Sequence, residues 1–177
     1  MKKVSFFLLG AAFLASSLAF VAPKNPKAPI TLAVQSDKSR VDFIGSKAGD
    51  FHTGTFAVKG GSVQVEGGKL VGGSFVIDLA NLKVTDAAGE RLAGHLKSAD
   101  FFDVAKFGEA VYTISSVDYS SATACKINGT LNIKGVGVPV SFDANIRSAS
   151  EKGLFGQAYF SLDRTLLGIA YAGPSKD

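Results

Sequence analysis

His52 and His95 are the two histidines of this 177-residue chain, and histidine is the side chain best suited to exchange protons near neutral pH. If both met Asp100 at one site, they could form an acid–base pair of the kind that a cyclase- or isomerase-like enzyme uses. Two separate hydrogen-bonding roles are the simpler interpretation. The sequence holds no H-x-x-x-H, C-x-x-C, G-x-S-x-G or phosphate-binding glycine pattern. We therefore predict no enzyme activity, no metal and no cofactor.

Arg164 and Cys125 are the other side chains with reactive potential. Arg164 follows Asp163, and the default interpretation is an ion pair at a strand end. The sharper hypothesis is that Arg164 meets an anionic head group of a ligand. Cys125 is the only cysteine, which excludes an internal disulfide and a cysteine-based metal cluster. We expect it to be a small, partly buried apolar side chain.

The stretch Glu90–Phe107 must position His95, and it departs from the strand pattern of the rest of the chain. Leu92 and Leu96 are four residues apart, so they share one face of a short helix, which we place near Ala88–Lys97. Such a helix needs a sheet to lie on. We interpret the stretch as a lid or plug, and the alternative is a helix that merely covers one end of a barrel.

The residues that follow this helix predict a turn. Ser98 and Asp100 can hydrogen-bond nearby backbone amides and so start a turn. We expect this turn to direct Phe101 and Phe102 back towards the body of the protein.

The rest of the chain alternates apolar and polar residues with a period of two, which predicts strands rather than helices. In Gly73–Leu79, for example, every second residue is apolar and lies on one face. Glycine doublets at Lys59–Gly61 and Glu66–Gly68 predict tight hairpin turns, and the last visible strand spans Leu154–Leu162. About eight such runs at roughly ten-residue spacing predict a closed or nearly closed antiparallel barrel or a sandwich.

The N-terminus predicts export. Lys2 and Lys3 precede an uncharged run with small residues, which is typical of a signal peptide over residues 1–19. An uncleaved anchor is the competing interpretation, since the run approaches the roughly 20 residues that span a bilayer. A proline- and lysine-rich linker would fill residues 20–29, followed by one domain over residues 30–177. Loss of both lysines lowers the formal charge from +4 to +2, so nucleic-acid binding is not implied. We expect a periplasmic or secreted protein.

Four segments together resemble one protein family. They are Ser39–Phe43, Gly89–Val104, Gly129–Val140 and Leu162–Arg164, and the part of the second from His95 onwards is the specific one. In this order they are similar to the YceI-like family of exported, lipocalin-like proteins that bind polyisoprenoids. The resemblance implies a barrel of about eight antiparallel strands whose apolar interior takes a long isoprenoid chain, as of a lipid carrier or an isoprenoid quinone. It implies no catalytic residue.

The chain departs from this family at its end. Family members usually continue from the Asp-Arg segment through a glycine-rich loop into a final apolar strand, whereas this sequence stops at Asp177. We therefore predict an all-β, lipocalin-like antiparallel β-barrel with one short lid helix. This barrel lacks its last strand. Such a chain is either a fragment or a barrel with an exposed edge, which invites pairing with another chain.

The leading functional hypothesis is an exported binding protein that holds a polyisoprenoid or a similar long apolar lipid in the barrel lumen, with transient membrane contact. The alternatives are the enzyme with His52 and His95, and a ligand-free envelope stress protein that fills its own core. We expect head-group contacts from His52, His95 and Arg164. The predicted ligand-binding residues of the lumen and the lid are Phe43, Phe56, Phe75, Ile77, Tyr112, Ile114, Leu131, Ile133, Phe142, Phe160, Leu96, Phe101 and Phe102.

Overall fold

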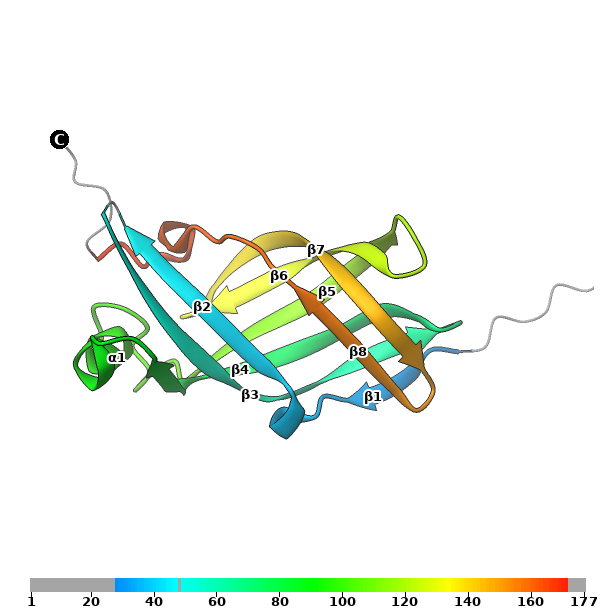
Figure 1. Cartoon of the computed structure of the whole chain (residues 1–177), viewed down its shortest axis with the longest axis horizontal. Coiled ribbons are helices and arrows are strands. Elements are labelled where there is room, and N and C mark those ends of the chain that lie inside the picture. The colour runs from blue at the N-terminus through cyan, green and yellow to red at the C-terminus, as the bar shows by residue number, and fades with distance from the viewer. Residues whose placement is uncertain (1–27, 48, 172–177) are drawn as a thin grey trace, which may run out of the picture.

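The computed structural model describes residues 28–47 and 49–171, which form eight strands, one α-helix and two short 3-10 helices (Figure 1). The strands are β1 (Ile30–Ala33), β2 (Arg40–Lys47), β3 (Asp50–Glu66), β4 (Lys69–Val84), β5 (Glu109–Tyr119), β6 (Ala124–Ile133), β7 (Val136–Ser150) and β8 (Gly153–Ala158). The helices are α1 (Gly89–Lys97), η1 (Ser36–Lys38) and η2 (Arg164–Leu167). The predicted lid helix is confirmed to within one residue.

Several predictions fall on parts of the chain that the structure does not describe. The signal peptide over residues 1–19 and most of the linker, residues 20–27, lie outside the described residues, as do the last six residues of the domain. The helices within the described residues are all too short or too polar to cross a membrane.

The sheet is antiparallel throughout and curls into a nearly closed barrel (Figure 1). Its strand order is β1-β3-β4-β5-β6-β7-β8, and the long β3 pairs with β2 along its first half and with β1 along its second half. This arrangement confirms the predicted all-β, lipocalin-like antiparallel barrel. Within the described residues, β8 pairs only with β7, while β1 and β2 pair only with β3. In the described sheet the outer edges of β8, β1 and β2 therefore have no paired strand, and the missing last strand stays a prediction.

One of the two predicted glycine turns is wrong. β3 continues through Gly60 and Gly61, where a register shift against β4 marks a bulge. Gly61 has a φ of 130°, and a Cβ there would overlap the carbonyl oxygen of Ser74, so the glycine lets the two strands approach closely. The other doublet is a turn as predicted, because Gly67 and Gly68 have φ values of 56° and 78° between β3 and β4.

The last strand is shorter than predicted. β8 ends at Ala158, and Phe160 and Leu162 lie in irregular backbone before η2. Beyond Ala158 the chain leaves the ladder of β7, and the Phe160 ring stacks on Phe142 instead. An alternation of apolar and polar residues predicts which side chains face the interior. It does not predict whether the backbone still pairs with a neighbouring strand.

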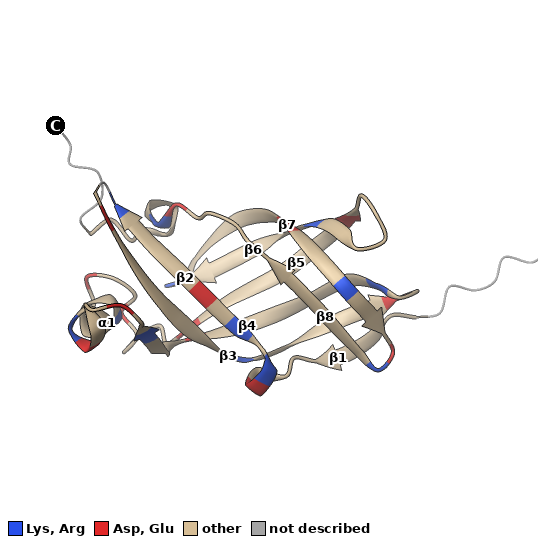
Figure 2. Ribbon diagram, viewed as in Figure 1, with Lys and Arg blue, Asp and Glu red and all other residues tan. Residues whose placement is uncertain are grey.

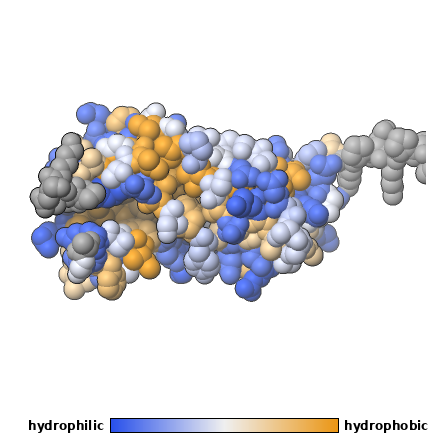
Figure 3. Space-filling model, turned by 90° about the horizontal axis from the view of Figure 1, so that it is seen from above, coloured by the Kyte–Doolittle hydropathy of each residue, from blue (hydrophilic) through white to orange (hydrophobic). Residues whose placement is uncertain are grey.

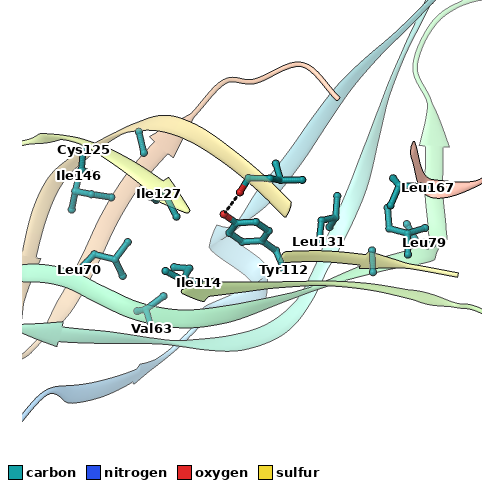
Figure 4. Close-up of a cluster of buried hydrophobic side chains, with 14 of the residues drawn as sticks. Val63, Leu70, Leu79, Tyr112, Ile114, Cys125, Ile127, Leu131, Ile146 and Leu167 are labelled. Carbon is teal, nitrogen blue, oxygen red and sulfur yellow. Dashed lines mark hydrogen bonds between the residues drawn. The ribbon is translucent and has the colours of Figure 1, made fainter. Parts of the chain in front are cut away.

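The core is apolar and lies between β3, β4, β5, β6 and β7, whose side chains point towards one another (Figure 4). At its centre the Tyr112 hydroxyl donates to the Val140 carbonyl at 2.9 Å. Cys125 is also buried there, and burial raises the pKa of its thiol. Among the described residues, no buried residue is of a polar or charged type. Charged residues lie mainly at strand ends, on edge strands and on the helices (Figure 2), so the interior offers an apolar surface.

Candidate ligand-binding interior and lid

The predicted lumen residues of the central strands all lie on the interior face, but they differ in burial. Opposite residues of an antiparallel ladder project to the same side, and the register pairs Phe75 with Tyr112 and Tyr112 with Leu131. The buried group comprises Tyr112, Ile114, Leu131 and Ile133, and the half-buried group comprises Phe75, Ile77 and Phe142. The buried group forms the base of the interior, and the half-buried group keeps apolar surface that a ligand could cover.

A row of three rings leads from the base of the interior to the surface. The Tyr112 and Phe142 rings lie 5.3 Å apart, and Phe160 stacks on Phe142 with a centroid distance of 4.6 Å. A Cβ on Gly129 would overlap the outer end of the Tyr112 ring, so this strand residue must be glycine for the ring to lie here. Phe160 is 51% exposed and closes the row at the surface. It therefore belongs to the rim of the interior rather than to its floor.

A second row of rings joins the first strands to the lid. The Phe43 and Phe56 rings are 5.0 Å apart, Phe56 and Phe102 are 5.8 Å apart, and Phe102 and Phe101 are 5.1 Å apart. All four rings are half-buried. A Cβ on Gly54 would overlap the Phe43 ring, which explains the glycine in this strand. At the end of the molecule that carries α1, Figure 3 shows a recess with an apolar floor.

The lid consists of α1 and the segment that follows it. Leu96 is buried, whereas Leu92 on the same face is half-buried, and α1 contacts β4. The Ser98 hydroxyl donates to the His95 carbonyl at 2.7 Å, so the prediction that Ser98 accepts from a backbone amide is wrong. A hydroxyl at a helix C-terminus meets free carbonyl groups rather than free amides.

The two lid rings fold back onto the barrel as expected. Phe101 and Phe102 pack against the core cluster, and the Lys134 ammonium donates to the Phe101 carbonyl at 2.8 Å. This bond ties the lid segment to the turn between β6 and β7. The cover is therefore held at both ends, by α1 on β4 and by Lys134.

His52 and His95 lie around one pocket of about 350 Å³, so the structure brings together the two histidines as the enzyme hypothesis requires. Ala88, Arg91, Leu92 and Tyr171 complete its lining. Asp100, the third residue of the predicted acid–base site, does not join them. It is exposed beyond α1 and does not line the pocket.

Asp86, rather than Asp100, is the carboxylate that bonds a histidine of the pocket. Its carboxylate accepts from Nδ1 of His52 at 3.2 Å, and from the backbone amides of Thr53 and Ala88, both at 2.8 Å. The hydrogen bonds from the amides of Ala88 and Thr53 hold the pKa of Asp86 below its ordinary value. Asp86 thereby links the start of α1 to β3. The sequence signal was an aspartate just ahead of a predicted helix, a common capping position.

The imidazole, guanidinium and phenol groups of the pocket lining can bind and orient polar groups. His52 has Asp86 on one ring nitrogen and Asp50 3.7 Å from the other, and His95 packs at ring distances of 6.2 Å from Phe101 and 4.5 Å from Tyr171. No group of three or more metal-ligating side chains is clustered in the described part of the chain. The arrangement is suited to hydrogen bonding at the polar end of an apolar interior.

Arg164 lies in η2, next to the lid. Its guanidinium stands 5.2 Å from the centre of the Phe101 ring and donates to the Ile169 carbonyl. The neighbouring Asp163 accepts from the hydroxyl of Thr165 at 2.7 Å and from its amide at 2.9 Å, and both bonds lower the pKa of Asp163. The structure therefore places the positive charge of Arg164 beside a ring of the lid segment.

Comparisons with known proteins agree with this architecture. Residues 32–176 match the YceI-like domain. The chain is 28% identical over 127 residues to a UPF0312 protein of Pseudomonas fluorescens, covering 69% of this chain and 66% of that protein, and 29% identical over 117 residues to one of Pseudomonas putida, covering 66% and 60%. It thus spans less than two thirds of the length of these relatives.

Solved structures show the same fold at low sequence identity. The crystal structure of the YceI protein of Campylobacter jejuni superposes with a TM-score of 0.53 at 16% identity, and covers 96% of this chain and 87% of that one. The family match extends over most of the chain, from the first strand to beyond η2. This chain therefore belongs to the YceI-like family.

Proposed function

We propose that this protein binds a polyisoprenoid or a similar long-chain apolar lipid, such as an isoprenoid quinone or a lipid carrier, in the interior of its barrel. The observation that carries the proposal is the half-burial of interior phenylalanines. Phe75 and Phe142 face the inside of the barrel and pack on its core, yet they keep exposed apolar surface. A prenyl chain laid along them would cover that surface and gain about 25 cal/mol for each Å² buried.

The lid end supplies the polar contacts that such a lipid needs. His52 and His95 line one pocket, and Arg164 lies over Phe101. We assign the head group of the ligand to these three side chains, and its chain to the two rows of rings. Phe101 and Phe102 would then lie over the chain and slow its escape.

Export to the periplasm or the exterior belongs to the same proposal. Its support is the basic start and apolar run of residues 1–19, which are typical of a signal peptide. A lipid carrier in that compartment would contact membranes transiently when it takes up or delivers its ligand.

Co-elution of a labelled polyprenol with delipidated protein in size-exclusion chromatography tests the binding directly. We expect the polyprenol to elute with the protein, and a short-chain alcohol of the same head group to be retained poorly because it buries less apolar area. A polyprenol that elutes apart from a folded protein would refute the proposal and favour the ligand-free alternative.

One observation favours an enzyme as the second candidate, namely that His52, bonded to Asp86, shares a pocket with His95. A carboxylate bonded to one imidazole nitrogen orients the ring and can support general base catalysis by the other nitrogen. This candidate predicts that the bound lipid is chemically converted, and that His95→Gln abolishes the conversion without loss of binding. A lipid recovered unchanged after long incubation with the wild-type protein would exclude it.

A further inference from the structure

The end of the β2–β3 hairpin carries two large apolar side chains that face the solvent. Ile44 is 74% exposed and Phe51 is 65% exposed. The register pairs Ile44 with Thr53 and Phe51 with Ser46, so the two apolar side chains are diagonal neighbours on one face of the hairpin. This end of the hairpin projects at the upper left of Figure 1. We call Ile44 and Phe51 the hairpin patch.

The opposite face of the same hairpin borders the histidine pocket. His52 alternates with Phe51 along β3, so its side chain points to the other side of the sheet, where it lines the pocket together with His95 of α1. The hairpin patch and the His52 side of the pocket therefore lie on opposite faces of the same hairpin. A surface that held the patch would also hold the lid end of the barrel close to it.

We propose that the hairpin patch inserts into the surface of a lipid bilayer and docks the barrel there. This inference rests on the proposed function, because a lipid carrier must exchange its ligand with a membrane. The size of the patch favours a bilayer over a second copy of the chain. Two such side chains expose on the order of 250 Å², whereas a stable protein interface buries roughly 800 Å² on each partner. A bilayer accepts single apolar side chains at the boundary between head groups and acyl chains.

The charges near the hairpin patch fit a zwitterionic surface. Arg40 pairs with Asp42 at 2.8 Å, and Lys47 pairs with Asp50 at 3.8 Å, so these four side chains add no net charge to the hairpin. Such a face gains little from anionic lipid and is not repelled by it. Docking therefore depends on apolar insertion, and added salt should change it only slightly.

Flotation with vesicles of phosphatidylcholine tests the docking, using the full protein purified from its own host. We expect the wild type to float, and the double variant Ile44→Ser, Phe51→Ser to lose roughly tenfold or more of its vesicle partition. The matched control is Phe155→Ser, which removes another exposed aromatic side chain, 56% exposed, from the edge strand β8. This control should float like the wild type, and phosphatidylglycerol added to the vesicles should leave the ranking unchanged.

Three results would overturn the docking proposal. The first is a wild type that does not float, and the second is a Phe155→Ser variant that loses as much partition as the hairpin variant. The third is a wild-type dimer that the hairpin variant converts to a monomer, because the patch would then bind a second copy.

Lipid extraction from the same preparations separates this proposal from the proposed function. A hairpin variant that keeps its lipid but no longer floats supports docking independently of binding. A wild type that floats but carries no lipid leaves the docking intact and refutes the binding function alone.

Discussion

Ile77→Trp is the substitution that best distinguishes a ligand-binding interior from an ordinary packed core. Ile77 faces the interior from β4, is half-buried, and lies opposite the small side chain of Ala110. If unfilled space exists there, the indole should occupy it, block lipid uptake and cost less than about 1 kcal/mol of unfolding free energy. In a close-packed core the same enlargement would cost about 1–3 kcal/mol or more.

The matched control is Val76→Trp, on the opposite face of the same strand. Val76 is the neighbour of Ile77, so its side chain points away from the interior. We expect this variant to bind lipid like the wild type. Urea unfolding followed by far-UV circular dichroism gives the stability of each variant, and extraction gives its lipid content. An Ile77→Trp protein that unfolds, together with an empty extract from the wild type, would show that the interior is a packed core and would refute the reasoning.

Three further predictions concern the lid, the core and the link between them. Phe101→Ala or Phe102→Ala should speed lipid release several-fold without changing which lipid is bound, as measured by transfer to acceptor vesicles; an unchanged rate would show that these rings do not cover the ligand. Tyr112→Phe should cost about 1 kcal/mol of unfolding free energy in urea, because the buried Val140 carbonyl loses its donor; no loss would mean that this bond contributes nothing. The pKa of Asp86 is lowered in the folded state, so the contribution of Asp86 to stability is complete above the unfolded pKa of about 3.9 and is lost as the pH falls through the lower folded pKa. Asp86→Asn should therefore flatten the decline of the urea unfolding midpoint in acid. An unchanged slope of the midpoint against pH would contradict this assignment.

Local patterns in the sequence predicted the barrel because the spacing of apolar residues over a few positions distinguishes its strands from its lid helix. Leu92 and Leu96 have helical spacing, and Phe75 and Ile77 have strand spacing, so each could be placed on a face without knowledge of the partner strand. The family resemblance then connected these elements to one known architecture. This reasoning therefore identified which side chains of the strands face inwards.

The features that were missed depend on contacts between residues far apart in the sequence. Lys59–Gly61 has the residue types of a turn, but a Cβ on Gly61 would overlap the Ser74 carbonyl oxygen of β4, so Gly61 is instead a point of close strand approach. Asp86 bonds His52, which is 34 residues away, and no local pattern indicates that pairing. Phe160 keeps the expected alternation after its backbone has left the ladder. In each case the tertiary partner decides the role of the residue.

Native mass spectrometry of the protein purified from its own host, followed by lipid extraction, tests the binding claim most directly. We predict a folded protein that carries an additional mass, released on unfolding and identified in the extract as a long-chain isoprenoid or a similar apolar lipid. A folded protein whose mass equals that of the polypeptide alone, with no apolar lipid in the extract, would contradict the claim that the interior of this barrel is a binding site.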